Sequence, residues 1–119
     1  MLILHVEDDP LMARAVNRSL KNCNTLVQVS TMQEFRGVWD GSSKAPGGSF
    51  DLVITDMEFP GGNGLQVAEL AAAAGIPCLV FSGAEPNQDV VAATGAQLVD
   101  KTNITGLINL VGALASRSG

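Results

Sequence analysis

Five short apolar runs divide the chain, and each ends at a polar residue or a turn. Several of these runs are continuous rather than alternating, which is typical of strands covered on both faces of a sheet. We therefore predict five buried strands. They are Leu2–Val6, Thr25–Val29, Leu52–Thr55, Cys78–Ser82 and Gln97–Asp100.

Most of the segments between these runs have apolar residues at the spacing of a helix. Asp9 and Pro10 form a helix start, with an N-cap followed by proline. Thr102 or Asn103 caps the last helix, and Gly75 ends the one that begins at Gly64. The apolar positions with helical spacing are Met12, Val16 and Leu20; Leu65, Ala68 and Ala72; and Ile104, Leu107, Ile108, Val111, Leu114 and Ala115. Two weaker helical patterns cover Thr31–Trp39 and Pro86–Ala93.

Strand and helix alternate five times, which predicts right-handed crossovers and an α/β fold. Its sheet is parallel, with helices on both faces. The segment Asp40–Ser49 reads as a flexible loop that is too short to separate two domains. We expect a single domain over residues 1–119.

Composition and charge narrow the function classes. Twelve acidic against seven basic residues give a net charge of −5, which argues against a nucleic-acid surface. No apolar run is long enough for a membrane helix, and the first residues lack the pattern of a secretion signal. Cys23 and Cys78 are too sparse for a disulfide scaffold or a zinc site. We expect two free thiols and a cytoplasmic location.

The candidate chemistry lies immediately after the strands. Glu7, Asp8 and Asp9 follow the first strand, and Asp56 follows the third, with Glu58 two residues on. Ser82 ends the fourth strand and Lys101 follows the fifth. In a parallel sheet these groups converge at one edge. Clustered carboxylates repel unless a cation neutralises them, and Mg²⁺ with oxygen ligands fits best. Asp56 could then be a nucleophile, with Lys101 and the Ser82 hydroxyl contacting a phosphoryl oxygen.

Each of these features has a simpler reading when taken alone. An acidic triplet after a strand is usually a helix cap in a solvated turn, and a single aspartate there usually forms a turn. A single lysine usually faces solvent. His5 is most simply a buried, hydrogen-bonded core histidine, and Trp39 a packing residue. The chemical reading depends on the joint arrangement, in which every group stands at the end of a predicted strand.

These residues resemble the response-regulator receiver domain of two-component signalling, and the resemblance covers nearly the whole chain. The matching motifs are Val6–Asp9, Asp56–Gly64, Ser82–Gly83, Gly95–Ala96 and Lys101. The resemblance implies a flavodoxin-like (βα)5 fold, a doubly wound sheet of five parallel strands with helices on both faces.

The same resemblance implies a role for each matching position. Asp56 is the phosphoacceptor and, with Asp8, a direct Mg²⁺ ligand. Glu7 binds the metal through water, and the backbone carbonyl of Glu58 is a further ligand. Ser82 supplies the switch hydroxyl and Lys101 the lysine that contacts the phosphoryl group.

Two positions depart from the family pattern. Leu98 stands where a tyrosine or phenylalanine is usual, and the chain contains no tyrosine. Thr102 follows the lysine where a proline is common. A segment that is one residue short between Gly95 and Lys101, and an insertion over Asp40–Ser49, are further differences. They bear on how a signal leaves the domain rather than on the phosphorylation site.

The expected function is a Mg²⁺-dependent phosphoacceptor that takes its phosphoryl group from a sensor histidine kinase or a histidine phosphotransfer protein. Such a domain catalyses only its own phosphorylation and dephosphorylation. A homodimer is a further partner to consider, whereas nucleic acid and membrane are not expected. The alternative is a receiver fold used for docking or dimerisation with a weakened switch. A small phosphatase with an aspartyl intermediate is the third reading, which the chain length disfavours.

Overall fold

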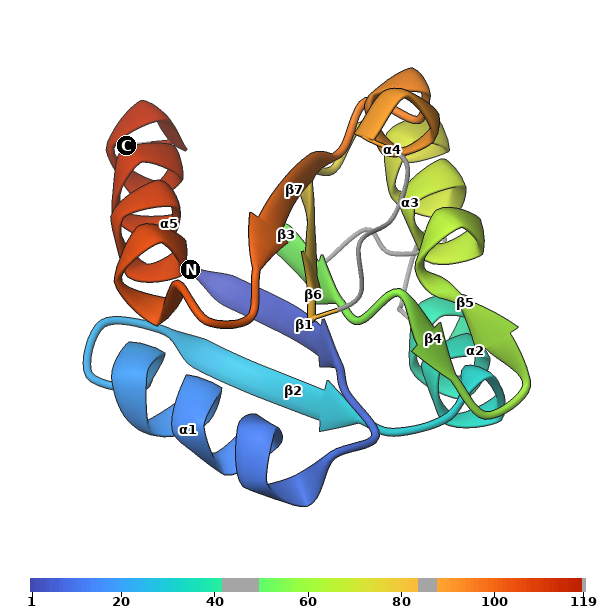
Figure 1. The fold of residues 1–119 in the computed structure, drawn as a ribbon, viewed down its shortest axis with the longest axis horizontal. Helices are drawn as coiled ribbons and strands as arrows, with labels where there is room; N and C mark the ends of the chain where they lie inside the picture. The colour runs from blue at the N-terminus through green and yellow to red at the C-terminus, as the bar shows by residue number, and fades with distance from the viewer. Residues whose placement is uncertain (42–49, 84–87, 119) are drawn as a thin grey trace.

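A five-stranded parallel sheet forms the centre of the molecule (Figure 1). The computed structural model describes residues 1–41, 50–83 and 88–118. The strand order β2-β1-β3-β6-β7 is that of the flavodoxin-like fold, as predicted. Every strand of this sheet has the bounds that the apolar runs predict. They are β1 (Leu2–Val6), β2 (Thr25–Val29), β3 (Leu52–Thr55), β6 (Cys78–Ser82) and β7 (Gln97–Asp100).

Helices cover both faces of the sheet (Figure 1). The helices α1 (Pro10–Leu20) and α5 (Ile104–Ser118) pack on one face. The opposite face carries α2 (Met32–Asp40), α3 (Gly64–Ala73) and α4 (Gln88–Ala93). Each strand therefore supplies alternate side chains to two separate apolar cores, which explains the continuous apolar runs in the sequence.

The helix starts follow from local hydrogen bonds. Asp9 caps α1 by accepting from Leu11 N at 3.0 Å, with Pro10 at the first helical position. Of the two predicted caps for α5, Asn103 is the one used, since its side chain accepts from Gly106 N at 2.9 Å. Thr102 instead donates its hydroxyl and backbone N–H to Asp100. All described peptide bonds are trans, including the one after Lys101.

Two details of the helices differ from the prediction. Leu65, Ala68 and Ala72 were expected to share the apolar face of α3, but Ala72 is exposed and Leu65 half-buried. The buried residues are Gly64, Val67, Ala68 and Ala71. Runs of alanine give little hydrophobic contrast around a helix, so the neighbouring elements decide which face is buried. The second difference is that α5 continues to Ser118, beyond Ala115, the last apolar position of the predicted pattern.

A two-stranded antiparallel hairpin follows β3, where the sequence indicates only a turn. Its strands are β4 (Glu58–Phe59) and β5 (Gly62–Asn63). Most of the predicted loop Asp40–Ser49, and the first residues of the predicted helix Pro86–Ala93, lie outside the described residues. Within the described ranges, no helix is both long and apolar enough to cross a membrane.

Candidate functional site

The predicted site residues meet at the carboxyl edge of the sheet. Glu7 follows β1, Asp56 follows β3 and Lys101 follows β7, and these strands are parallel in one sheet. Lys101 Nζ lies 3.0 Å from Asp56 Oδ2 and 2.9 Å from Glu7 Oε1. Three residues that are far apart in the sequence thus form one connected charged group.

Each carboxylate of this group is held from more than one side. Lys101 donates its hydrogen bonds to Glu7 Oε2 at 3.1 Å and to Asp56 Oδ2 at 3.0 Å. The other oxygen of Asp56, Oδ1, accepts from Met57 N at 2.8 Å. Glu7 Oε2 also accepts from Asp9 N at 3.3 Å. The carboxylate of Asp56 therefore has one oxygen fixed by the backbone and the other facing Lys101.

A divalent cation fits this donor set. Glu7, Asp8 and Asp56 each offer a carboxylate oxygen, and these oxygens all lie within 4.8 Å of one another. The three residues run from buried to exposed, so an ion would be held by protein on one side and reached by water on the other. Hard oxygen donors with open water positions are the coordination that Mg²⁺ prefers.

The electrostatics show how strongly these charges affect one another. Burial raises the pKa of Glu7 to about 7, with the nearby Asp56 adding to the rise and Lys101 opposing it. Burial alone would lower the pKa of Lys101, but its hydrogen bonds to both carboxylates outweigh that effect and the net pKa is raised. The lysine is therefore a fixed cation, whereas Glu7 exchanges its proton near neutral pH.

The remaining predicted residues take different places around this centre. Ser82 is buried at the last position of β6, and its carbonyl accepts from Lys101 N at 3.1 Å. Asp8 is exposed at the rim, and Glu58 projects an exposed side chain from β4. Asp9 serves as the cap of α1 rather than as a member of the carboxylate cluster.

The first residue of α3, Gly64, packs against the backbone of Asp56 so closely that no side chain fits there. Gly64 N donates to Met57 O at 2.7 Å, and a Cβ at Gly64 would stand 2.5 Å from Asp56 O. The hairpin between these residues is also tied to α2, because Met32 N donates to Pro60 O at 2.9 Å. The conformation around Asp56 thus depends on a glycine at the start of α3.

A polar pair beneath the site is not evident from the sequence. His5 is fully buried, as expected, and its Nδ1 lies 3.1 Å from Gln28 Nε2, which also donates to Ala13 O at 2.8 Å. The pKa of His5 is lowered to about 4, chiefly by burial and also by the charge of Lys101, with Asp56 opposing both effects. The contact joins positions 23 residues apart, so only the strand register, which pairs His5 with Gln28, could have predicted it.

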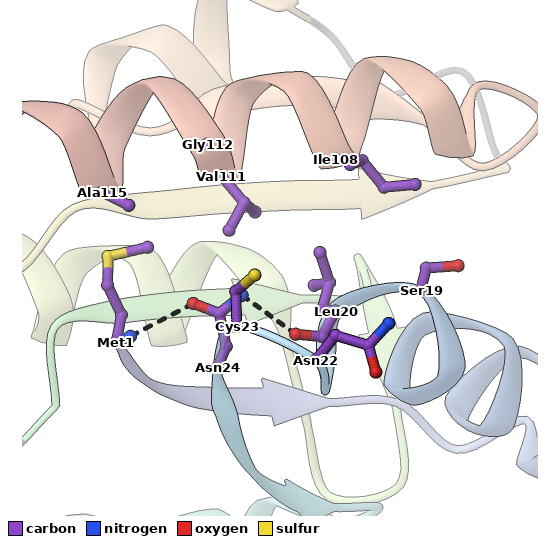
Figure 2. Close-up of a pocket in the computed structure, with 10 residues that line it drawn as sticks. All are labelled: Met1, Ser19, Leu20, Asn22, Cys23, Asn24, Ile108, Val111, Gly112 and Ala115. Atoms are coloured by element: carbon purple, nitrogen blue, oxygen red, sulfur yellow. Dashed lines mark hydrogen bonds between the residues drawn. The ribbon is translucent and has the colours of Figure 1, made fainter.

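A separate hollow of about 210 Å³ lies away from the carboxylates, between helix α5 and the turn that joins α1 to β2 (Figure 2). The exposed thiol of Cys23 opens into it, facing Ile108 and Val111 across the gap. Asn24 closes one side by accepting from the terminal ammonium of Met1 at 3.2 Å. This hollow contains none of the predicted site residues.

Comparisons with known proteins agree with the geometry. The family model for the response regulator receiver domain matches residues 3–102 of this chain. The swarming motility regulation protein RssB of Serratia marcescens is 31% identical over 93 residues, which make up 76% of this chain and 40% of that protein. The chain thus spans less than half the length of this relative.

Solved structures show the same fold at lower identity. A response regulator receiver domain protein from Clostridium thermocellum superposes with a TM-score of 0.82 at 18% identity, covering 98% of this chain and 95% of that one. The response regulator TrrA of Thermotoga maritima, solved in complex with Mg²⁺ and BeF, has a TM-score of 0.77 at 22% identity, with 95% and 97% covered.

Proposed function

Because the chain belongs to the response regulator receiver domain family, we propose that it accepts a phosphoryl group on Asp56 in two-component signalling. The observation that carries this proposal is the contact of 3.0 Å between Lys101 Nζ and Asp56 Oδ2, beside the oxygens of Glu7 and Asp8. The cluster combines an acceptor carboxylate, a fixed cation and a set of metal ligands in one place.

The proposed Mg²⁺ ligands are Asp8 and Asp56 directly, the backbone carbonyl of Glu58, and Glu7 through water. A bound Mg²⁺ would neutralise charge on the oxygens of the transferring phosphoryl group. The three clustered carboxylates of Glu7, Asp8 and Asp56 supply the negative charge that such an ion needs.

The chain's own residues then account for the transfer. A carboxylate oxygen of Asp56 forms a bond to phosphorus while the bond from phosphorus to the donor histidine nitrogen breaks, and that nitrogen keeps the electron pair. Lys101 contacts a phosphoryl oxygen as a fixed positive charge. Ser82, on the neighbouring strand end, donates its hydroxyl to another phosphoryl oxygen and so distinguishes the phosphorylated state.

The proposed donor is a sensor histidine kinase or a histidine phosphotransfer protein in the cytoplasm. The domain then works as a switch that catalyses only its own phosphorylation and dephosphorylation, with no turnover of an external substrate. Support comes from the family match and from the neighbour TrrA, which was solved with Mg²⁺ and BeF. Phosphorylation adds charge and hydrogen-bond acceptors that can shift a two-state element.

Incubation with Mg²⁺ and acetyl phosphate, followed by intact mass measurement, tests the proposal. The expected result is the addition of one phosphoryl group, which Asp56→Asn abolishes and EDTA prevents. Asp40→Asn, which changes an exposed carboxylate at the end of α2, is the matched control and should still be phosphorylated. No addition that depends on Asp56, with this donor or with a kinase, would refute the function.

Leu98 favours one alternative, a receiver fold that serves mainly in docking or dimerisation. This residue occupies the position where the family usually has an aromatic side chain, and it packs half-buried against the core on the α2–α4 face. Partner binding that Asp56→Asn leaves unchanged would support this alternative over a phosphorylation-driven switch.

A further inference from the structure

Two polar atoms at the buried end of β1 have no hydrogen-bond partner among the described residues. They are His5 Nε2 and Glu7 Oε1. Glu7 Oε1 lies 2.9 Å from the Lys101 ammonium, but the hydrogen bond from that ammonium goes to the other oxygen, Oε2. Within the described ranges, His5 Nε2 therefore has no partner of any kind, whereas Glu7 Oε1 has the charge of Lys101 beside it but no hydrogen bond. A buried polar group without a hydrogen bond costs about 1–3 kcal/mol, so the His5 N–H calls for a physical explanation.

The two atoms are complementary as donor and acceptor. Gln28 Nε2 donates to Ala13 O, so it is the amide nitrogen, and its second hydrogen is directed to His5 Nδ1 at 3.1 Å. Nδ1 is therefore the unprotonated nitrogen of the ring, and the proton of the neutral imidazole is on Nε2. His5 thus has one N–H to donate, and Glu7 has one carboxylate oxygen to accept.

The backbone places both side chains on the same face of the sheet. His5 and Glu7 are two residues apart along one extended segment, so their Cα atoms are separated by about 6.6 Å. This spacing sets the two side chains beside each other, and the two atoms make no direct hydrogen bond. A single water can join two buried polar atoms that do not contact each other. The hydrogen bonds from Gln28 to His5 and to Ala13 orient the ring from the α1 side.

We propose that His5 Nε2–H donates through one internal water to Glu7 Oε1, and that His5 is thereby a positioning residue for the Glu7–Lys101 pair. Internal waters of this kind join polar groups that would otherwise stay unpaired. His5 contacts neither metal nor phosphoryl group in this arrangement. Its hydrogen bond holds the Glu7 carboxylate in the orientation that faces Lys101 and the proposed ion.

The hydrogen bond itself can be tested without any assumption about function. His5 is the only histidine in the chain, so its ring signals in a ¹⁵N-labelled sample need no assignment. We expect the Nε2–H tautomer at neutral pH, with a ring proton that exchanges slowly with solvent. An Nδ1–H tautomer, or a charged ring at neutral pH, would overturn the proposal.

A pair of variants tests whether the ring proton reaches Glu7. Glu7→Ala should shift the Nε2–H signal or speed its exchange, because the final acceptor is removed. Asp9→Ser is the matched control: it removes the neighbouring carboxylate but keeps a side chain that caps α1, and it should leave the signal in place. An unchanged signal in Glu7→Ala contradicts the proposal. Should that variant unfold, Lys101→Met gives the second test, since release of Glu7 must also move the signal.

The consequence for the site rests on the proposed function and is measured as Mg²⁺ affinity by calorimetry. His5→Leu keeps an apolar side chain in the core but loses the donor, and we expect Mg²⁺ to bind about tenfold more weakly. His5→Gln restores an N–H near the position of Nε2 and should recover most of the affinity. Equal affinities for wild type and His5→Leu would refute the positioning role. If Asp56 accepts no phosphoryl group while the His5 signals behave as expected, only the proposed function fails.

Discussion

Lys101 Nζ lies 3.0 Å from Asp56 Oδ2, so the lysine after the last strand directly contacts the carboxylate after the third. The two residues are 45 positions apart and meet only because their strands are parallel in one sheet. Without a metal, this lysine is the cation that balances the carboxylates of Asp56 and Glu7.

Lys101→Met should therefore destabilise the metal-free protein, because it leaves two neighbouring carboxylates without their cation. We expect a loss of about 1–3 kcal/mol in the free energy of unfolding, measured by urea denaturation in EDTA. Added Mg²⁺ should recover part of this loss, since it supplies the missing positive charge. Lys21→Met, which changes an exposed lysine at the end of α1, is the control and should shift stability by less than about 0.5 kcal/mol. Equal loss in both variants would contradict the assignment.

Mg²⁺ affinity should depend on pH around neutrality because the pKa of Glu7 is raised to about 7. Metal binding favours the ionised carboxylate, so affinity should increase as pH rises to about 7 and level off above it. In the metal-free protein the sign is opposite: the folded state binds the proton more tightly than the unfolded chain does. Stability should then fall as pH rises from about 4.5 to about 7.

Calorimetry in buffers of different ionisation enthalpy measures the protons released when Mg²⁺ binds. Glu7→Gln provides the comparison, since an amide does not titrate and the pH dependence near 7 should disappear. A wild-type affinity that stays flat between pH 6 and pH 8 would show that Glu7 is not coupled to the metal.

Gly64→Ala should disrupt the site although residue 64 carries no functional group. Its Cβ would stand 2.5 Å from Asp56 O and 3.2 Å from Met57 Cα, so the backbone that holds the acceptor must move. We expect a loss of about 1–3 kcal/mol in stability and slower phosphorylation from acetyl phosphate. Gly37→Ala is the matched control in α2, where a new Cβ meets nothing within 4 Å, and it should stabilise the protein by about 0.5–1 kcal/mol.

The strands of the main sheet could be predicted because their residues are buried on both faces. Leu52–Thr55 is an example, since all four of its residues are buried and its one polar residue, Thr55, stands at the end of the run. The site followed from the same reasoning: once the strand ends are known, a parallel sheet brings Glu7, Asp56 and Lys101 to one edge. The sequence order of these residues therefore contained most of the geometry of the site.

The contacts that depend on close packing could not be predicted in this way. The hairpin of β4 and β5 has two residues in each strand, too few for an alternating pattern. The buried face of α3 is decided by its neighbours because alanines dominate the helix. The contact between His5 and Gln28 requires the register of β1 against β2, which no local pattern encodes.

The two cysteines should differ sharply in reactivity. Cys23 is exposed beside the hollow under α5 (Figure 2), whereas Cys78 is buried in β6, where burial raises its pKa to about 12. At pH 8 only about one Cys78 thiol in ten thousand would be ionised. A thiol reagent such as DTNB should thus react quickly with one equivalent in the native protein, and Cys23→Ser should abolish that fast phase. The second thiol should react only as the protein unfolds in urea, because β6 is an interior strand paired with β3 and β7. Two fast equivalents in native buffer would contradict the burial of Cys78.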